Sequence, residues 1–324
     1  MRRIIFIAGL LCIACEPDGS TTPEVTATPE EASPTPEVPT PAATPLPVPE
    51  PGEGIQLKSA VLTVAPGEDL TLCTYINGAI SETSAVNGSI AQQGIGGHHI
   101  VVYETDGEKP EGVEPCYESS SGMVDGSMVL GNFLKGNRTA YPDGLAVKIE
   151  PQNSLIVDSH YINTTDHTIE VQDVINLFFI PMDEVTAFLG SYMLANFDIN
   201  VQPGSEYSTT ATCTVPMDMD AVLMMGHQHE WGTQINIDHT PLGGSTVNLY
   251  RGLPTVTDPT QAGMLFYYDA PLALRRGDEI SWQCDWFNDT DHVLAWPEEM
   301  CTVVFTYYPE APQQIVCARS VENL

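Results

Sequence analysis

Short apolar runs separated by turn residues make up most of the chain after residue 54. The runs are rich in Val, Ile, Thr and Tyr and are bounded by Gly, Pro, Asn and Asp, a pattern typical of β-strands. No long segment has apolar residues at helical spacing. Many short strands at this spacing predict an all-β fold built from antiparallel sandwiches or jelly rolls. The clearest predicted strands are 60–64, 99–103, 154–157, 169–174, 221–225, 246–250, 264–268, 280–283 and 302–308.

A boundary near residues 181–183 separates these strands into two sets. The apolar run 174–180 is typical of a buried closing strand, and 185–201 reads as the start of a second sheet system. The pattern therefore predicts two tandem antiparallel β-sandwich domains, 55–182 and 183–324. Each is large enough to hold a hydrophobic core of its own.

The composition is strongly acidic, which excludes several classes of partner. The 324 residues include 43 Asp and Glu against 11 Lys and Arg, giving a formal net charge of -32. Such a chain has no basic surface for nucleic acid or for anionic lipid. The hydrophobic content of 42% is too high for a wholly disordered protein. No apolar run after the N-terminus is long enough for a transmembrane helix, so none is expected in the mature protein.

The N-terminus has the order of an export signal. Arg2 and Arg3 precede a short apolar run that stops at Cys15. The end of this run resembles the lipobox of bacterial lipoproteins, so 1–15 is predicted to be a lipoprotein signal peptide, with lipid attached to Cys15. An ordinary signal peptide cleaved elsewhere is the alternative. Residues 16–54 are rich in Pro, Thr and Glu, which predicts a disordered, extended tether. We expect an exported protein anchored to a bacterial membrane, in the periplasm or at the cell surface.

Six cysteines remain in the predicted folded region, and an exported chain meets oxidising conditions. They are Cys73, Cys116, Cys213, Cys284, Cys301 and Cys317. None lies in a Cys-x-x-Cys motif or close to a His, so disulfides are favoured over a zinc-thiolate site. Six cysteines allow 15 pairings, and their spacing alone does not choose among them.

Five of the 8 histidines fall in three groups with metal-binding potential. His227 and His229 follow the predicted strand 221–225, and residues two apart on a strand face the same side, where two imidazoles can chelate one ion. His98 and His99 are adjacent, so a regular strand would point them to opposite faces. The glycines before them permit a bend or bulge that turns the two rings together. His160 forms the third group. Three further histidines stand alone and are expected to be structural or exposed: His167, His239 and His292.

Taken singly, each group is compatible with incidental histidines on a polar face, but their order along the chain resembles a known family. This family is the copper type II, ascorbate-dependent monooxygenases, which include peptidylglycine α-hydroxylating monooxygenase and dopamine β-monooxygenase. Its members carry a His-His pair and a His-Tyr motif in the first domain, then His-x-His and Glu-Met-Cys motifs in the second. The matching motifs here are His98-His99, His160-Tyr161, His227-Gln228-His229 and Glu299-Met300-Cys301. The resemblance extends over about residues 57–320.

The resemblance implies two copper ions. It implies that His98, His99 and His160 hold the copper that transfers electrons. His227, His229 and Met300 match the catalytic centre, where dioxygen reacts. A thioether suits Cu(I), and imidazole suits both oxidation states of copper. The family pattern also implies the disulfides Cys73–Cys116, Cys213–Cys317 and Cys284–Cys301, the last of which fixes the strand that carries Met300.

The match departs from the peptide-hydroxylating members at the positions that bind their substrate. Those enzymes use an Arg two positions before the His-x-His motif to hold a carboxylate, and Met225 occupies that place here. They also use an Asn and a Tyr after the Met ligand, where this chain has Thr302 and Val304. A thioether and a hydroxyl do not replace a bidentate carboxylate clamp. C-terminal glycine-extended peptides are therefore not the expected substrate, and the pocket is predicted to be more apolar.

The resulting hypothesis is a copper-dependent monooxygenase that hydroxylates a C–H bond of a small organic molecule. It would use O₂ with ascorbate or another one-electron donor, and would act as a monomer without nucleic acid. Two alternatives come from other classes of protein. One is a lipoprotein that binds or sequesters copper without turnover. The other is a β-sandwich recognition module that has lost catalysis.

Overall fold

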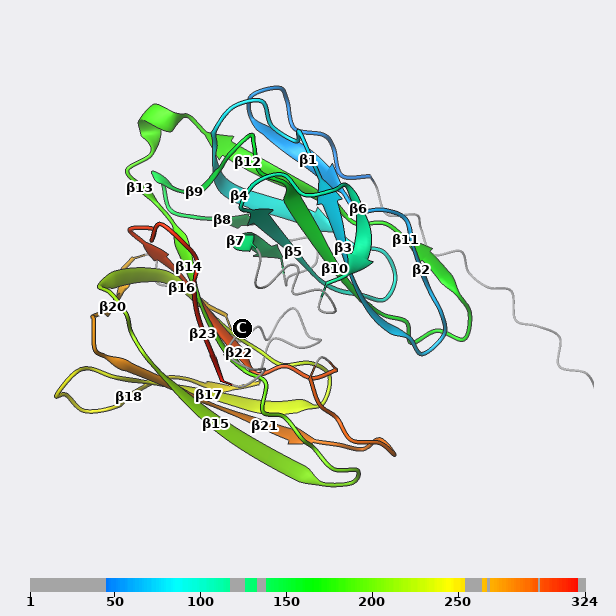
Figure 1. Ribbon diagram of the computed structural model, residues 1–324, viewed down its shortest axis with the longest axis vertical. Coiled ribbons are helices and arrows are strands. Elements are labelled where there is room, and N and C mark those ends of the chain that lie inside the picture. Colours follow the sequence, from blue (N-terminus) through cyan, green and yellow to red (C-terminus); the bar gives the residue numbers. More distant parts are fainter. Residues whose placement is uncertain are drawn as a thin grey trace, which may run out of the picture. The chain divides into compact units, whose positions relative to one another are not determined.

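The described part of the computed structural model comprises residues 45–116, 126–132, 138–253, 264–266, 269–296 and 298–319. These residues belong to one compact unit that begins at Pro45. The predicted signal peptide with Cys15, and residues 16–44 of the predicted tether, lie outside the described residues. The fold is all-β, as predicted, with several antiparallel sheets (Figure 1). The short 3₁₀ turn η1 (Met182–Glu184) is the one helical element among the described residues.

Three sheets form from the strands of the first half. One has the order β1-β12-β4-β9-β13, with β8 also paired to β4, and a second has the order β6-β3-β10-β5-β7; the third pairs β11 with β2. Their bounds are β1 Gly54–Lys58, β2 Leu62–Val64, β3 Asp69–Ile76, β4 Ser84–Gln92, β5 Gly97–Thr105, β6 Gly112–Pro115, β7 Gly126–Asn132, β8 Arg138–Ala140, β9 Leu145–Ile149, β10 Leu155–Ile162, β11 Ile169–Val171, β12 Val174–Ile180 and β13 Ala187–Phe188.

Two sheets form from the strands of the second half. One has the order β19-β16-β22-β14-β23, with β20 also paired to β16, and the other has the order β15-β21-β17-β18. Their bounds are β14 Gly190–Asn196, β15 Glu206–Thr214, β16 Met219–His227, β17 Gly232–Thr240, β18 Val247–Gly252, β19 Met264–Phe266, β20 Leu272–Leu274, β21 Glu279–Phe287, β22 Thr302–Tyr308 and β23 Ile315–Arg319.

Strand pairing divides the described chain between β13 and β14. Every pairing up to Phe188 joins strands of the first half, and every pairing from Gly190 onward joins strands of the second. All are antiparallel except β13 with β9 and β14 with β23. The boundary at 182/183 between two independent domains stays a prediction, since the described residues form one compact unit.

The last residues of the predicted tether contact the first half. The Leu46 amide donates to Gln92 Oε1 at 3.0 Å, and Asn176 Nδ2 donates to the Pro47 carbonyl at 2.7 Å. Gly54 is already the first residue of β1. The tether predicted to reach residue 54 thus differs from the structure at this end, because side chains of β4 and β12 bind its backbone.

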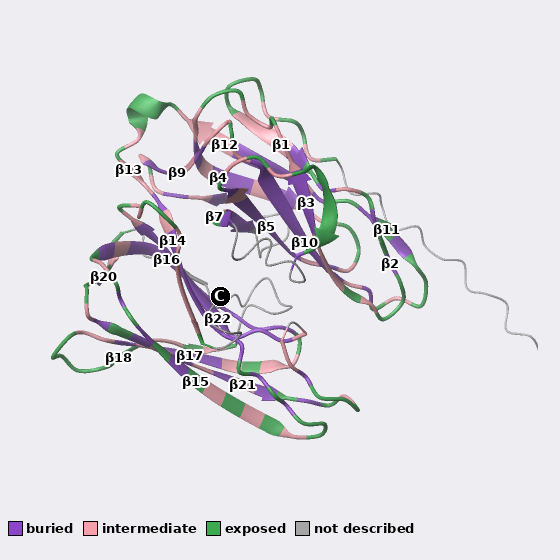
Figure 2. Cartoon of the chain, viewed as in Figure 1, coloured by how far each residue is buried: buried purple, intermediate pink, exposed green. Residues whose placement is uncertain are grey.

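Burial separates the strands that carry the cores from those at the surface (Figure 2). In β22 only the last residue, Tyr308, is less than fully buried. In β15 most side chains are exposed or half-buried, and only Ala211 and Cys213 are buried. The nearly continuous apolar run of β22 is typical of a sheet covered on both faces. The alternating pattern of β15 is typical of a sheet with one face in solvent.

The two halves share a hydrophobic cluster in addition to the core of each. Val101, Tyr103 and Ile156 of the β5–β10 sheet pack in this cluster with residues of β14, β16 and β22. Those partners include Met193, Leu223, Met225 and Val304, and Met300, two residues before β22, belongs to the same cluster. The start of β5 carries His98 and His99, and β16 ends at His227. These predicted ligands therefore belong to sheets that pack against each other.

Three disulfides brace the described residues, at the pairs that the family resemblance implied. They join Cys73 to Cys116, Cys213 to Cys317 and Cys284 to Cys301. Asp158 lies close enough to Cys73 and Cys116 to complete a three-residue group, but a disulfide removes those sulfurs as metal ligands. Disulfides indicate that the chain folds in an oxidising compartment, as an exported protein does.

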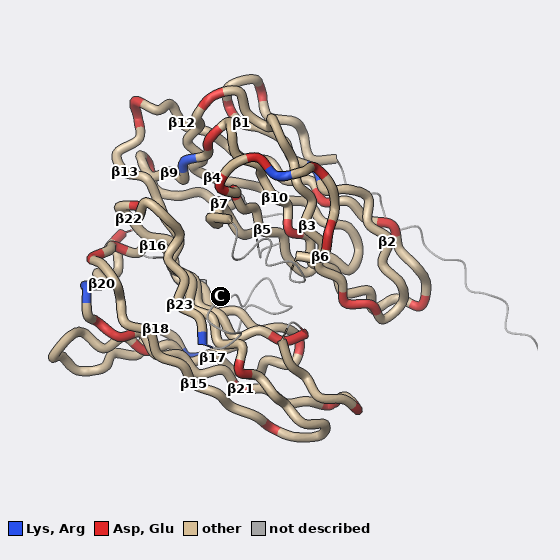
Figure 3. The backbone as a smooth tube through the Cα atoms, in the orientation of Figure 1, with Lys and Arg blue, Asp and Glu red and all other residues tan. Residues whose placement is uncertain are grey.

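Acidic side chains greatly outnumber basic ones along the described backbone (Figure 3). Acidic residues lie on loops and strand ends in both halves, and the few Lys and Arg residues are scattered among them. Among the described residues, none of the helical structure is long and apolar enough to cross a membrane.

Candidate metal centre

A β-bulge at the start of β5 turns His98 and His99 toward each other. Along the β10–β5 ladder, His160 pairs with His99 but Tyr161 pairs with Gly97, which leaves His98 as the extra residue. Gly96 has a φ of +78°, and a Cβ there would lie 2.8 Å from the Ile162 carbonyl oxygen. Only glycine fits this conformation and this approach. The bulge predicted from the glycines before the His pair is confirmed.

The bulge places three imidazoles around one point. The Nδ1 atoms of His98 and His160 lie 3.0 Å apart, and those of His98 and His99 lie 3.2 Å apart. One nitrogen of each ring falls within 4.8 Å of the other two, which defines a group able to hold a metal ion. His99 and His160 are buried, while His98 is half-buried. We call these residues the three-His centre.

A carboxylate on β3 fixes the orientation of His160. Asp69 Oδ1 accepts a hydrogen bond from His160 Nε2 at 2.6 Å. A carboxylate only accepts, so the proton of this ring sits on Nε2 and the Nδ1 lone pair faces the other two imidazoles. Metal-bound histidines commonly have such an outer carboxylate. Sequence analysis missed Asp69, which lies 91 residues from His160 in the chain.

The second histidine pair lies at the end of β16. His227 is the last residue of the strand, and His229 lies in the turn that follows. Their ring centroids are 5.2 Å apart. The sequence predicted that strand alternation would bring the two rings to one side, but the turn after the strand does so instead. The turn closes with the Gly232 amide donating to the His229 carbonyl at 3.1 Å. A Cβ at Gly232 would lie 2.6 Å from that of Gln228, so the missing side chain makes room for the turn.

A buried nitrogen of His229 points to a ligand. Its Nδ1 lies 2.9 Å from the Glu298 carbonyl oxygen and must carry the proton, because a carbonyl only accepts. The other nitrogen, Nε2, is buried and has no hydrogen-bond partner among the described residues. A buried lone pair of this kind calls for an ion or a donor. A soft-to-borderline cation such as copper fits it.

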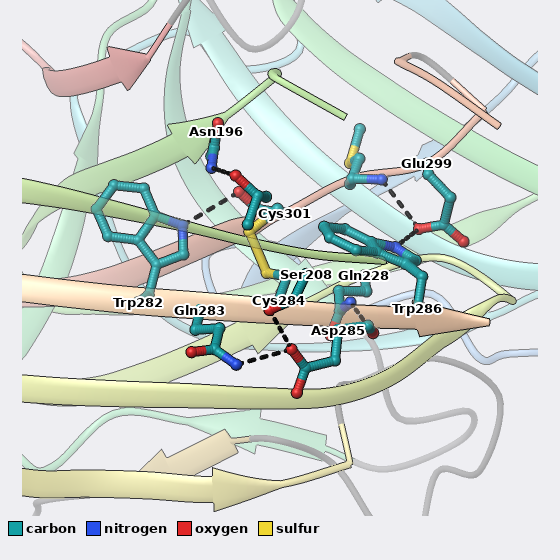
Figure 4. The surroundings of a disulfide bond; sticks show 12 residues. Asn196, Ser208, Gln228, Trp282, Gln283, Cys284, Asp285, Trp286, Glu299 and Cys301 are labelled. Atoms are coloured by element: carbon teal, nitrogen blue, oxygen red, sulfur yellow. Dashed lines mark hydrogen bonds between the residues drawn. A yellow bond between two sulfur atoms is a disulfide. The ribbon is translucent and has the colours of Figure 1, made fainter. Parts of the chain in front are cut away.

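Glu299 ties together the backbone around His229 and Met300. Figure 4 shows its hydrogen bond with Trp286, close to the Cys284–Cys301 disulfide. Glu299 Oε2 accepts from the His229 amide at 3.0 Å, from Trp286 Nε1 at 2.8 Å and from the Met300 amide at 3.2 Å. Its Oε1 accepts from the Trp231 amide at 2.9 Å. Burial raises the pKa of Glu299 to about 7, while these hydrogen bonds act in the opposite direction. The Cys284–Cys301 disulfide lies beside this network and joins β21 to the residue that precedes β22.

Met300 lies on the wall of a cavity of about 40 Å³, together with His227 and His99. Met225, Thr302 and Val304 line the same cavity. In the β16–β22 ladder, Met225 pairs with Val304 and His227 with Thr302. The three positions at which this chain departs from the peptide-hydroxylating enzymes are therefore neighbours around one cavity. We call His227, His229 and Met300 the His₂Met centre.

The two centres meet in one cluster. Ring centroids lie 5.0 Å apart for His160 and His229, 5.2 Å for His99 and His227, and 6.1 Å for His98 and His229. Sequence analysis predicted two trios, and the imidazoles of both are here within van der Waals reach.

Burial favours the neutral form of two of these imidazoles, His99 and His229. Burial, and then the neighbouring His160, hold the pKa of His99 and of His229 well below the ordinary value. Neutral imidazoles keep the lone pairs that metal ions need. The solitary histidines lie apart from the cluster: His239 is paired with Asp278 at 2.8 Å, His292 with Glu298 at 2.7 Å, and His167 is exposed.

The same supporting framework occurs in both halves. Gln93 Nε2 donates to the His160 carbonyl at 3.5 Å, and Gln228 Nε2 donates to the Asp285 carbonyl at 2.9 Å. In each half, the residue after this carbonyl is an aromatic side chain that donates a hydrogen bond to a buried carboxylate. Tyr161 donates to Asp173, and Trp286 donates to Glu299.

An Asn-x-Thr turn follows in each half. Asn163 and Asn288 each donate to the carbonyl of the His four residues later, at 2.9 and 2.7 Å, and each accepts from the amide two residues later. The halves therefore repeat one framework, but they place their candidate metal ligands at different points of it.

Comparisons with known proteins add little to this geometry. No family model matches the chain, and no curated protein matches it. Among solved structures, the chain is similar to the PBSX exported protein XepA, with 10% identity, 78% of this chain and 86% of that chain covered, and a TM-score of 0.22. A second similarity is to a T=3 Penaeus vannamei nodavirus, with 11% identity, 89% and 99% covered, and a TM-score of 0.15.

Proposed function

We propose that the protein is a copper-dependent monooxygenase that hydroxylates a C–H bond of a small organic substrate. The observation that carries this proposal is the convergence of five imidazoles from both halves beside a cavity that Met300 lines. The set combines nitrogen ligands with a thioether, which is the donor chemistry that copper uses in both of its oxidation states.

In this proposal the three-His centre handles electrons. His98, His99 and His160 would each present Nδ1 to one ion, with Asp69 holding the His160 ring in place through Nε2. Three neutral imidazoles suit both Cu(I) and Cu(II), so such a centre accepts and passes single electrons. It has no thioether to bias it toward the reduced state.

The His₂Met centre would perform the oxidation. His229 would offer its buried Nε2, and Glu299 would hold the backbone of His229 and Met300 at a fixed separation. When bound, copper supplies the redox chemistry that activates dioxygen. The apolar cavity beside Met300 would hold the substrate and exclude bulk water.

The overall reaction balances with an external donor of two electrons. A substrate RH, O₂, two electrons and two protons give ROH and H₂O, and two molecules of ascorbate or another one-electron donor supply the electrons one at a time. The short separation of the two groups of imidazoles supports transfer of one of these electrons within the protein.

The test is product formation by the copper-loaded protein. With ascorbate, O₂ and a panel of small C–H compounds, we expect O₂ consumption and a product heavier by one oxygen atom in mass spectrometry. Met300→Leu should lower product formation roughly tenfold or more, because it removes the soft ligand. Met182→Leu, at an exposed methionine on η1, is the matched control. Copper binding without any product would favour a non-catalytic copper-binding lipoprotein instead.

We further propose that the chain is a lipoprotein anchored through Cys15. The support is the signal-like order of residues 1–15 and the disulfides, which fit an exported protein. Expression with a clickable fatty acid should label the protein, and Cys15→Ser should abolish the label. Labelling that survives this substitution would contradict the assignment.

A further inference from the structure

The cavity beside Met300 has a distinctive lining. Its walls come from β5, β7, β14, β16 and β22, with the two rings of His99 and His227 at one side. The remaining residues around it are Val101, Tyr103, Met128, Ser191, Met193, Met225, Met300, Thr302, Val304 and Gln314. Four of these are methionines, whose flexible side chains let a cavity adapt its shape to an occupant. At about 40 Å³ it is small but large enough to hold more than one water molecule.

No Lys, Arg, Asp or Glu is among the residues that line this cavity. A charged ligand would lose its hydration there without meeting an opposite charge, and an unpaired charge in such surroundings is strongly disfavoured. An uncharged ligand with an apolar carbon skeleton loses much less. The side chains of this lining therefore offer no counter-charge to a charged organic ligand.

One hydroxyl in this lining is without a partner. Ser191, on β14, is 5% exposed, and its Oγ is buried with no hydrogen-bond partner among the described residues. A buried hydroxyl is normally satisfied, since leaving it unpaired costs stability. Because it both donates and accepts, it matches a hydroxyl or a carbonyl group of a ligand.

A wider polar cavity adjoins the inner one. It has a volume of about 550 Å³ and shares Met128, Ser191 and Gln314 with the inner cavity. Four carboxylates line it, together with a single cation, Lys148. Lys148 is already paired with Glu150 at 3.7 Å and with Glu310 at 3.3 Å. The lining of the outer cavity is therefore net acidic, which disfavours anions in the cavity that borders Ser191.

From this geometry we propose that the inner cavity binds small, uncharged, largely apolar molecules that carry one hydroxyl or carbonyl group. Ser191 holds that polar group, and the carbon skeleton extends between Met193, Met225 and Val304 toward Met300. The ligand enters past Gln314 from the outer cavity. The role of this ligand as a substrate rests on the proposed monooxygenase function, but its binding does not.

The test uses three probes that share one alkyl chain: butan-1-ol, butylammonium and butyrate. The full chain carries ¹³C-labelled methionine methyl groups, and the resonances of Met193 and Met225 are assigned with single Met→Leu variants. Titrations are run on the metal-free protein and on the Cu(I)-loaded protein, which is diamagnetic. We expect saturable shifts of both methyl groups with butan-1-ol and, in the metal-free protein, binding at least about tenfold weaker for the two ions.

Substitution of Ser191 tests the polar contact. Ser191→Ala should weaken binding of butan-1-ol by about 3- to 10-fold, the usual value of one hydrogen bond. Ser127→Ala, at an exposed serine of the outer cavity, should leave it unchanged. Equal binding of the alcohol and either ion by the metal-free protein, absence of saturable shifts, or equal effects of the two serine substitutions would each overturn the proposal.

The two proposals fail separately in this design. Copper content and product formation are measured on the same samples. Selective binding of butan-1-ol without copper uptake would support the proposed pocket and contradict the proposed monooxygenase. Copper uptake and product formation without the expected selectivity would support the proposed monooxygenase and contradict the proposed ligand class.

Discussion

At the scale of single residues, sequence motifs located the candidate ligands but not the groups that position them. The three His groups and Met300 stood out through their order and their resemblance to a family. Asp69 could not be found this way, because it is far from His160 in sequence and belongs to no motif. Ser191 likewise has an ordinary context, and only burial of its unpartnered hydroxyl marks it.

Removal of the Asp69 carboxylate should weaken the three-His centre. In Asp69→Asn the amide can still bond to His160 but no longer favours the proton on Nε2 as strongly, so we expect copper affinity at this centre to fall about 10- to 100-fold. Competition with a Cu(I) chelator measures this. Asp166→Asn, at an exposed carboxylate beside His167, is the control. Equal affinities for Asp69→Asn and the control would show that Asp69 has no positioning role.

Asp173 should make stability depend on pH. Burial raises its pKa to about 6 from an ordinary value of 3.8. The folded protein therefore holds a proton that the unfolded chain has lost. The stabilisation of the folded state by this proton is complete below the pKa of Asp173 in the unfolded chain, near pH 4. It disappears as the pH rises through the folded-state pKa of about 6.

Relative to Asp173→Asn, the native protein should lose about 2 kcal/mol of unfolding free energy between pH 4.5 and pH 7.5. Urea unfolding of both metal-free proteins at the two pH values measures the difference, and the substitution itself is the control for other titrating groups. A difference that is constant with pH, or that grows in favour of the native protein, would contradict the assignment.

At the scale of elements, continuous apolar runs predicted strand bounds best. The predicted runs 174–180 and 302–308 coincide with β12 and β22. β22 is buried except for its last residue, but in β12 only the stretch 175–177 is buried, so the prediction of a buried strand there is only partly correct. Strand β15 was missed because its exposed face carries Ser, Thr and Glu and only Ala211 and Cys213 are buried. The bulge at His98 was predicted, since Gly96 and Gly97 give a local signal. The placement of His229 beyond the end of β16 was not, because a turn closed by Gly232 decides it.

The bulge should be sensitive to a single methyl group. Gly96 and Gly67 both have a positive φ, but only at Gly96 would a Cβ meet another atom, the Ile162 carbonyl oxygen. Gly67→Ala should cost about 1 kcal/mol for backbone strain alone. Gly96→Ala should cost more than this and also weaken copper binding by the three-His centre, because His98 leaves its position. Unfolding in urea and Cu(I) competition check the two effects; equal costs and unchanged copper binding would rule out this role for the bulge.

At the scale of the whole molecule, the closeness of the two His groups is what sequence reasoning was least able to provide. Each group was predicted as a separate centre within its own half. Their actual separation depends on how the β5–β10 sheet packs against β14, β16 and β22 through a shared apolar cluster. Such packing depends on shape complementarity between surfaces, which no local pattern records.

The same hydrogen-bonded framework supports the candidate ligands in both halves. In both halves a Gln, an aromatic donor, a buried carboxylate and an Asn turn hold the same backbone. The first half places a ligand, His160, directly before its aromatic residue, where the second half has Asp285. The second half places its ligands beside Gln228 and Glu299 instead. Two similar scaffolds therefore carry different sets of candidate metal ligands on sheets that pack against each other.

Copper content per chain is the most direct test of two distinct centres in this cluster. The native protein, the His98→Ala/His99→Ala variant and the His227→Ala/His229→Ala variant would be loaded with Cu(I), dialysed and analysed by mass spectrometry of the metal, with urea unfolding to establish that each is folded. We expect two copper ions per native chain and one in each variant. A single ion in the native chain that both variants lose, or an unchanged content in all three proteins, would contradict this expectation.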